Sequence, residues 1–293
     1  MDAWLSDFIA AEGLPADFAR SARAICAPLA ARIVAEPRKP GFVVGICGSQ
    51  ASGKSTLTAV LRRMLQDQGL KVAALSLDDL YLTRAQRQDL AHEVHPLLAT
   101  RGVPGTHDVA LGIAVLDGLA LPRATLLPAF DKAADDRRPE GVSIAGPADV
   151  ILFEGWCVGA VAQADVSVPI NDLERQRDPD GRWRAFVNAA LAGPYQPLFA
   201  RLDLLVLLQA PSFEIVLAWR REQEAKLRAR LTREGGDLKR AMTDDQVADF
   251  IAHYERLTRH ILAEMPGRAD MVVELDPERR PVIMASPPPS PAP

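Results

Sequence analysis

The sequence predicts an α/β protein with a doubly wound, mainly parallel sheet and helices on both faces. Residues 41–47 form an apolar run that suits a buried strand. Residues 54–68 have helical periodicity and stop before a glycine, and residues 71–77 form a second strand-like run. Strand, glycine-rich turn, helix and strand make a βαβ unit, whose right-handed crossover makes its two strands parallel.

The rest of the chain continues this alternation. Residues 150–153 and 204–208 are short apolar runs bounded by turn or charged residues, as in central strands covered on both faces, and residues 271–275 add a last strand. Long helical patterns cover residues 212–233 and 244–264. We therefore expect the sheet to grow by further strands joined through helices.

The predicted organisation is one large domain with additions. Two helices, at residues 4–11 and 16–35, precede the first strand. A stretch that mixes prolines, charges and one helix is too long for a simple connection and is interpreted as an insertion near the active site. The predicted units are a helical N-terminal appendage (1–40), the main domain (41–280), its insertion (165–193) and a disordered, proline-rich tail (281–293).

The composition excludes several classes of protein. With 293 residues, 48% of them hydrophobic, the chain can bury a sizeable core. Its net charge of -4 offers no basic field for a nucleic acid. No run of apolar residues is long enough for a membrane helix, and the acidic start lacks the pattern of a secretory signal, so a cytoplasmic location is expected. Cys26, Cys47 and Cys157 lack metal-ligand spacing and are predicted to be buried, reduced thiols.

Residues 48–55, GSQASGKS, match G-x-x-x-x-G-K-[ST] between the first strand and its helix. Glycines let such a loop curl until its amides converge on phosphate oxygens, and the helix N-terminus adds positive charge. Lys54 suits the β and γ phosphates and Ser55 suits Mg²⁺, so ATP and Mg²⁺ are the predicted cofactors. The alternative is a glycine-rich turn that binds nothing. The predicted cofactor-binding residues are Gly48, Ser49, Gln50, Ala51, Ser52, Gly53, Lys54, Ser55 and Thr56.

Carboxylates end two of the predicted strands. Asp78 and Asp79 end the second strand, which is expected beside the strand that leads into the glycine-rich loop. Ligands of open α/β sheets bind at this edge, where a carboxylate accepts the proton of an attacking hydroxyl. Asp78 is the predicted base, while Asp79 is better explained as a cap of the following turn. Glu154 ends the 150–153 strand and is a predicted metal ligand with Ser55, because a buried glutamate without a cation is costly.

The sequence resembles one branch of the P-loop kinases, which contains phosphoribulokinase, uridine kinase, type I pantothenate kinase and plant-type D-glycerate 3-kinase. The resemblance spans residues 41–275. Four segments in order resemble the plant-type D-glycerate 3-kinase group: SLDDLYLT (76–83), RGVPGTHD (101–108), FEGWCVG (153–159) and WRREQE (219–224). The resemblance implies a P-loop kinase fold and direct transfer from ATP to a hydroxyl of D-glycerate, with Asp78 and Lys54 as catalytic residues.

Two loops are predicted to bind the acceptor, a small molecule. Arg101 suits a carboxylate, and His107 and Asp108 suit hydroxyls. Asp108 also stands where the N-cap of a helix at residues 109–119 is expected. The family segment at residues 128–137 adds two cations for the acid group, with a solvated charged loop as the alternative. The predicted substrate-binding residues are Asp78, Tyr81, Arg101, His107, Asp108, Lys132 and Arg137.

Residues 212–235 resemble the lid of these kinases. Arg220, Arg221 and Lys226 are predicted to approach the phosphates when the lid closes, whereas a solvated helix face paired with glutamates is the alternative. A kinase of another metabolite, such as a nucleoside or pantothenate, remains open. So does a regulatory protein that only binds ATP, although such a protein has no need of a base such as Asp78.

Overall fold

The computed structural model describes residues 3–15, 17–36 and 39–285. Of the predicted disordered tail, residues 281–285 form a strand instead, because they pair with the strand before them, and residues 286–293 lie outside the described ranges. The helices are α1 (Ala3–Ala11), α2 (Phe18–Ala35), α3 (Lys54–Asp67), α4 (Arg84–Glu93), α5 (Val109–Leu119), α6 (Asp172–Arg177), α7 (Arg182–Ala192), α8 (Tyr195–Phe199), α9 (Phe213–Glu234) and α10 (Asp244–Glu264). The strands are β1 (Phe42–Gly48), β2 (Val72–Ser76), β3 (Ala124–Leu127), β4 (Phe130–Asp131), β5 (Asp136–Arg137), β6 (Val142–Ala145), β7 (Val150–Gly155), β8 (Leu204–Gln209), β9 (Met271–Leu275) and β10 (Pro281–Ala285).

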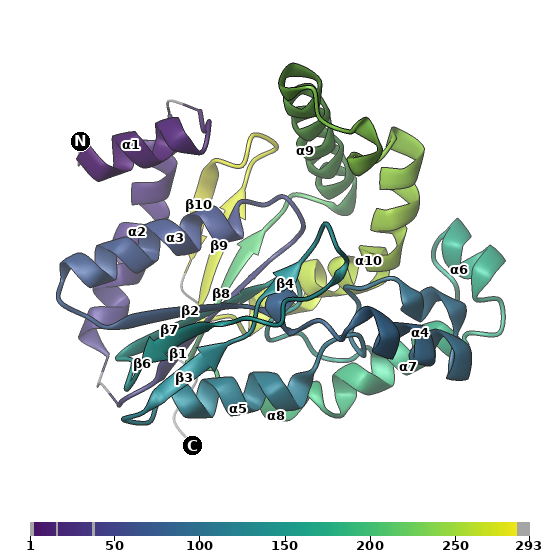
Figure 1. The fold of residues 1–293 in the computed structure, drawn as a ribbon, viewed down its shortest axis with the longest axis horizontal. Coiled ribbons are helices and arrows are strands. Elements are labelled where there is room, and N and C mark those ends of the chain that lie inside the picture. The colour runs from purple at the N-terminus through teal and green to yellow at the C-terminus, as the bar shows by residue number, and fades with distance from the viewer. Residues whose placement is uncertain (1–2, 16, 37–38, 286–293) are drawn as a thin grey trace.

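The predicted α/β class is confirmed. The central sheet has the order β10-β9-β8-β1-β7-β2; β10 runs antiparallel to β9, and the other pairs are parallel. Helices α2 and α3 cover one face of the sheet, and α5 and α8 cover the other (Figure 1). β1 and β7 are buried along their whole lengths, as strands at the centre of such a sandwich must be.

The predicted position of the second strand is wrong. β2 does not pair with β1, because β7 lies between them. The crossover from β1 through α3 to β2 leaves one strand position open between β1 and β2. β7, which comes much later in the sequence, occupies that position. In the resulting register Glu154 lies opposite both Ile46 of β1 and Ser76 of β2. This strand order places Glu154 between the glycine-rich loop and Asp78.

Other elements were not predicted. β3 pairs with β6 and β4 pairs with β5, in two small antiparallel ribbons outside the central sheet. The ribbon of β3 and β6 is largely exposed, so its sequence lacks the apolar signal of a buried strand. Residues 165–193 contain two helices, α6 and α7, where one was predicted. Asn171 caps α6 and Asp178 follows its last residue, which separates the two helices.

The N-terminal helices share the main core. Leu5 of α1 and Ile25 and Leu29 of α2 belong to the same buried cluster as the strands of the sheet. The division of the chain into an appendage and a main domain stays a prediction. Among the described residues, no helix combines the length and the apolar character that crossing a bilayer requires. The three cysteines are free and buried, as predicted.

Candidate active site

The glycine-rich loop joins β1 to the N-terminus of α3. Ala51 (φ 59°) and Gly53 (φ 89°) both have left-handed backbones, which curl the loop back on itself. The approach is close at Gly48, where an added Cβ would lie 2.8 Å from the Ser52 hydroxyl oxygen. The buried side-chain oxygens of Ser49 and Ser52 have no hydrogen-bond partner in the part of the chain that the structure describes. The loop therefore has the strand-to-helix setting and the unpaired polar groups that a phosphate site needs.

Lys54, Ser55 and Glu154 meet at the start of α3. The Ser55 hydroxyl donates a 2.8 Å hydrogen bond to Glu154 Oε1, and Lys54 Nζ lies 4.0 Å from Glu154 Oε2. Glu154 is buried, and its Oε2 atom has no hydrogen-bond partner among the described residues. Mg²⁺ prefers hard oxygen ligands of this kind, and a cation would satisfy the unpaired Oε2 atom. These residues fit a magnesium site.

Asp78 follows β2 in the short 3-10 helix Leu77–Leu80, and both of its carboxylate oxygens have partners. The Tyr81 hydroxyl donates to Oδ1 over 2.7 Å, and Lys132 Nζ donates to Oδ2 over 2.6 Å. Burial raises the pKa of Asp78, but the charges of Lys132 and Lys54 and the two hydrogen bonds outweigh burial and lower this pKa to about 2. Asp78 is therefore ionised at neutral pH.

Asp79 has a different partner. Its Oδ1 atom accepts a hydrogen bond from the backbone amide of Phe130 over 3.2 Å, at the start of β4. Asp79 was predicted to cap the following turn. In the structure its side chain instead joins the end of β2 to a segment about fifty residues further along the chain.

The loop at residues 101–108 lies beside Asp78. His107 is buried, stacks on Tyr81 with ring centroids 4.8 Å apart, and shares a 2.6 Å hydrogen bond with the Tyr195 hydroxyl through Nδ1. Burial lowers the pKa of His107 to about 4, so the ring is neutral. His107 holds Tyr81, which in turn holds Asp78. Contact of His107 with a substrate stays a prediction.

Asp108 is the predicted N-cap of α5 and also pairs with a cation, while its contact with an acceptor hydroxyl stays a prediction. Its Oδ1 atom accepts from the Leu111 amide over 3.0 Å as the N-cap of α5. Its Oδ2 atom pairs with Arg137 at 3.3 Å. One carboxylate thus fixes the start of a helix and one of the predicted acceptor cations.

β4, β5 and the turn between them, residues 130–137, form what we term the charged hairpin. Its side chains pair with three predicted site residues: Lys132 with Asp78, Asp135 with Arg101, and Arg137 with Asp108. Arg101 also lies over the Phe130 ring, 5.5 Å from its centroid. The structure therefore gathers the cations predicted for the acceptor at the edge of the sheet where Asp78 lies. Their contact with an acceptor stays a prediction.

Sequence reasoning missed Arg87 of α4, which is fully buried beneath the charged hairpin. It donates to Asp135 Oδ2 and to the carbonyl of Leu82, each over 2.6 Å. Asp135 has a left-handed backbone (φ 55°) and binds Arg87 and Arg101 through separate oxygens. In a helix rich in polar residues, the sequence carries no signal that distinguishes Arg87 from its exposed neighbours.

Replacing Arg87 with methionine should lower the free energy of unfolding by about 3 kcal/mol, because it removes a fully buried guanidinium and leaves Asp135 Oδ2 and the Leu82 carbonyl without their donor. Urea denaturation followed by circular dichroism measures this change. Arg84→Met, at an exposed position of the same helix, is the matched control. Equal stability of the two variants would contradict the structural role of Arg87.

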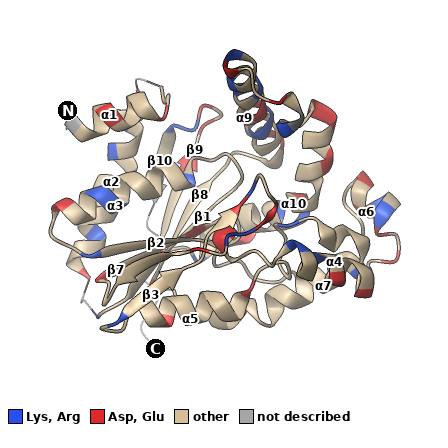
Figure 2. Ribbon diagram, viewed as in Figure 1, with Lys and Arg blue, Asp and Glu red and all other residues tan. Residues whose placement is uncertain are grey.

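Two of the three basic residues predicted for the lid are paired with glutamates of α9 itself. Arg220 pairs with Glu224 at 2.5 Å and Lys226 pairs with Glu222 at 2.6 Å. Arg221 is exposed. Both charge signs mark α9 along its length (Figure 2). This arrangement resembles the alternative interpretation, a solvated helix face whose basic residues pair with glutamates. The approach of these residues to the phosphates stays a prediction.

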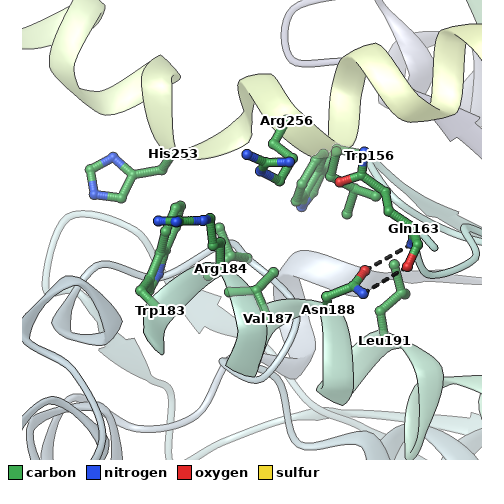
Figure 3. A pocket seen from close by; sticks show the side chains of 11 residues that line it. Trp156, Gln163, Trp183, Arg184, Val187, Asn188, Leu191, His253 and Arg256 are labelled. Carbon is green, nitrogen blue, oxygen red and sulfur yellow. Dashed lines mark hydrogen bonds between the residues drawn. The ribbon is translucent and has the colours of Figure 1, made fainter. Parts of the chain in front are cut away.

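A hollow behind the active site is lined by α7, α10 and Trp156 (Figure 3). Gln163 and Asn188 close one side through reciprocal hydrogen bonds of 2.8 and 2.9 Å. The residues that line the hollow include none of those predicted for catalysis. Val103 of the 101–108 loop also lines the hollow, and Trp156 donates to the Gly102 carbonyl of that loop over 2.8 Å. The predicted insertion thus packs against the 101–108 loop, where Leu173 and Trp183 share a buried cluster with Val103.

One further group of side chains has the spacing of metal ligands: His95, Asp178 and Asp180. His95 Nδ1 accepts the Leu97 amide, so the proton of the neutral ring lies on Nε2, which faces Asp178 at 3.8 Å. Asp178 already pairs with buried Arg184 at 2.8 Å. These contacts describe a structural network and not a metal site.

No protein-family model matches the chain. The uncharacterized kinase mug58 of Schizosaccharomyces pombe is 32% identical over 273 residues, which cover 85% of this chain and 94% of that protein. The chloroplastic D-glycerate 3-kinase of Arabidopsis thaliana is 29% identical over 264 residues, 83% of this chain and 54% of that protein, so the chain spans about half of the plant enzyme. The structure of D-glycerate 3-kinase from Cryptococcus neoformans var. grubii matches with a TM-score of 0.69 and 28% identity, over 93% of this chain and 99% of that one.

The parallel sheet, the glycine-rich loop and the kinase relatives define a P-loop phosphotransferase. More narrowly, the chain belongs to the family of P-loop kinases that includes mug58 and the D-glycerate 3-kinases. The relatives imply ATP as the phosphoryl donor.

Proposed function

We propose that the protein phosphorylates a small hydroxy acid, with D-glycerate as acceptor and 3-phosphoglycerate as product. The observation that carries the proposal is the group of cations near Asp78: Lys132 contacts it, Arg137 lies in the same charged hairpin, and Arg101 pairs with Asp135 of that hairpin. Three cations beside the base suit an acceptor that carries a carboxylate next to its hydroxyls. Similarity to two proteins named D-glycerate 3-kinase supports this choice.

In the proposed reaction, the loop amides and Lys54 hold the phosphates of ATP while Asp78 orients the acceptor hydroxyl for in-line attack and takes its proton. Lys54 stabilises the charge that develops on the transferring group. Ser55 and Glu154 would hold Mg²⁺, which when bound offsets the charge of the phosphates. The Tyr81 hydroxyl, which burial keeps protonated by raising its pKa, fixes Asp78 through Oδ1.

Lys132 links acceptor binding to the strength of the base. Without an acceptor, Lys132 pairs with Asp78 and helps to lower the pKa of that carboxyl to about 2, which makes it a weak base. The Lys132 side chain is 63% exposed, so it is free to turn toward the carboxylate of an acceptor. Loss of its nearest cation raises the pKa of Asp78 and makes it a better proton acceptor. An acidic acceptor would thus activate its own base.

The first test measures ADP release from Mg·ATP with D-glycerate, and in parallel with L-glycerate, uridine, pantothenate and no acceptor. Phosphorus NMR of the product then assigns the phosphorylated position. Turnover with D-glycerate and a 3-phosphate signal would confirm the proposal. Turnover only with uridine or pantothenate would replace the acceptor and keep the kinase, while ATP binding without turnover on any of these would favour a regulatory ATP-binding protein.

Replacing Lys132 with methionine should raise KM for D-glycerate about 10- to 100-fold, because a charge-assisted contact with a carboxylate contributes about 1.5–3 kcal/mol. KM for ATP should stay close to that of the wild type. Steady-state kinetics with each substrate varied in turn measure both constants. Lys71→Met, at an exposed lysine before β2, is the control.

Glycerol, which lacks the carboxylate, provides a second readout. Lys132→Met should react with glycerol at least as fast as the wild type does, because Asp78 loses the cation that lowers its pKa and glycerol has no carboxylate for Lys132 to bind. An equal rise in KM for both acceptors would contradict a contact between Lys132 and the acid group.

A further inference from the structure

The turn between β9 and β10 brings a distant arginine to the glycine-rich loop. Arg279 Nε donates a 2.8 Å hydrogen bond to the carbonyl oxygen of Ala51, across a separation of 228 residues. Arg279 itself has a left-handed backbone (φ 64°), as Ala51 has. Both residues carry a Cβ, which disfavours the left-handed conformation. Surrounding contacts must therefore hold the backbone of both Ala51 and Arg279, the two partners of this hydrogen bond.

The same guanidinium contacts α9. Arg279 Nη1 pairs with Glu222 Oε2 at 2.8 Å, and the guanidinium carbon lies over the Trp219 ring, 5.0 Å from its centroid. Trp219 in turn donates to the Pro277 carbonyl over 2.6 Å, which ties α9 to the same turn. Figure 1 shows this turn beside α9. One side chain therefore joins the glycine-rich loop, the predicted lid and the β9–β10 turn.

The contact at Ala51 bears on phosphate binding. A carbonyl fixed from outside the loop fixes the whole peptide plane between Ala51 and Ser52, because peptide bonds are planar. The orientation of that plane decides where the loop amides point, and amides that are already aimed at phosphate oxygens need no reorganisation when the ligand binds. Arg279 touches the back of the loop through Ala51, so it acts by holding the shape of the loop.

We propose that Arg279 is a positioning residue for the nucleotide: it holds the glycine-rich loop in its phosphate-binding shape and couples that shape to the position of α9. The proposal rests on the proposed role of the loop in binding ATP and is independent of the acceptor. Its test therefore measures nucleotide binding with no acceptor present.

Arg279→Gly is the informative variant. It removes the guanidinium, and glycine also tolerates the left-handed backbone, so the turn itself should fold at least as well as in the wild type. The Kd for Mg·ATP, measured by isothermal titration calorimetry, should rise about tenfold, since the hydrogen bond and ion pair of one guanidinium are lost. The Tm without nucleotide should stay the same or rise.

Arg280→Gly is the matched control. Arg280 is the next residue, and its guanidinium pairs with Asp17 on the surface at 3.1 Å, away from the loop. This variant should bind Mg·ATP with the Kd of the wild type. A wild-type Kd in Arg279→Gly would overturn the proposal. Weaker binding of Mg·ATP by both glycine variants, with an equal loss of Tm in both, would also overturn it, because the effect would then come from folding alone.

Glu222→Gln tests the coupling to α9. It removes the ion pair and leaves the bond to Ala51, so the Kd should rise about two- to fivefold, less than in Arg279→Gly. Added to Arg279→Gly, it should cause no further loss, because the partner is already absent. Additive effects in the double variant would show that Glu222 acts independently of Arg279 and would overturn the coupling.

Discussion

Asp78→Asn should lower kcat about 10²- to 10⁴-fold and change the Kd for Mg·ATP by no more than about twofold, since a positioned base contributes to the transition state and not to nucleotide binding. Asparagine keeps an oxygen that accepts the Tyr81 hydroxyl but takes no proton from the acceptor. It also leaves Lys132 without its 2.6 Å partner, so acceptor binding should be preserved or improved. Steady-state kinetics and calorimetry together separate these effects.

Asp79→Asn is the control for this prediction. The side-chain oxygen of asparagine still accepts from the Phe130 amide, so the charged hairpin keeps its anchor while a neighbouring charge is lost. We expect kcat within about threefold of the wild type, as for loss of a group with no part in proton transfer. Normal turnover in Asp78→Asn, or equal losses in both variants, would remove Asp78 from its assigned role.

The second large effect is expected at Lys54. Lys54→Met should lower kcat/KM about 10²- to 10³-fold, because it deletes a fixed charge from the place where negative charge develops. The Kd for Mg·ATP should rise as well, which distinguishes this variant from Asp78→Asn. Methionine preserves most of the volume of the largely buried lysine stem, whose side chain is 15% exposed.

Arg62→Met, at an exposed position of the same helix, is the control for Lys54→Met. Its kcat/KM should match that of the wild type. Unaltered activity of Lys54→Met would show that the loop does not handle the transferring phosphoryl group in the way its pattern predicts.

The sequence predicts best what is local. The glycine-rich loop needs a strand before it and a helix after it, and β1 and α3 begin and end within a residue or so of the predicted ranges. Asp78 and Glu154 were placed at the ends of strands because each follows a short apolar run, and both lie at the same edge of the sheet in the structure. α10 and β9 match the predicted ranges for the same reason: each has an unbroken period and clear boundaries.

Long-range features could not be predicted from the sequence. The apolar character and the periodicity of the strands do not reveal that β7 lies between β1 and β2, because any of the buried strands suits any central position in the sheet. Arg87 and Asp135 meet under the charged hairpin 48 residues apart, and only the fold reveals that one of many polar residues is buried. Arg279 was missed because its left-handed backbone and its partner in the glycine-rich loop are properties of the folded chain.

The strand order also has a consequence for synthesis on the ribosome. β1 emerges early, yet its two neighbours in the sheet, β7 and β8, begin only at Val150 and Leu204. Until Gln209 has left the exit tunnel, the nascent chain carries an apolar strand with an unpaired edge on at least one side, which invites pairing with other chains. The glycine-rich loop that follows β1 also contacts Arg279, so its full set of contacts forms only after most of the chain has been made.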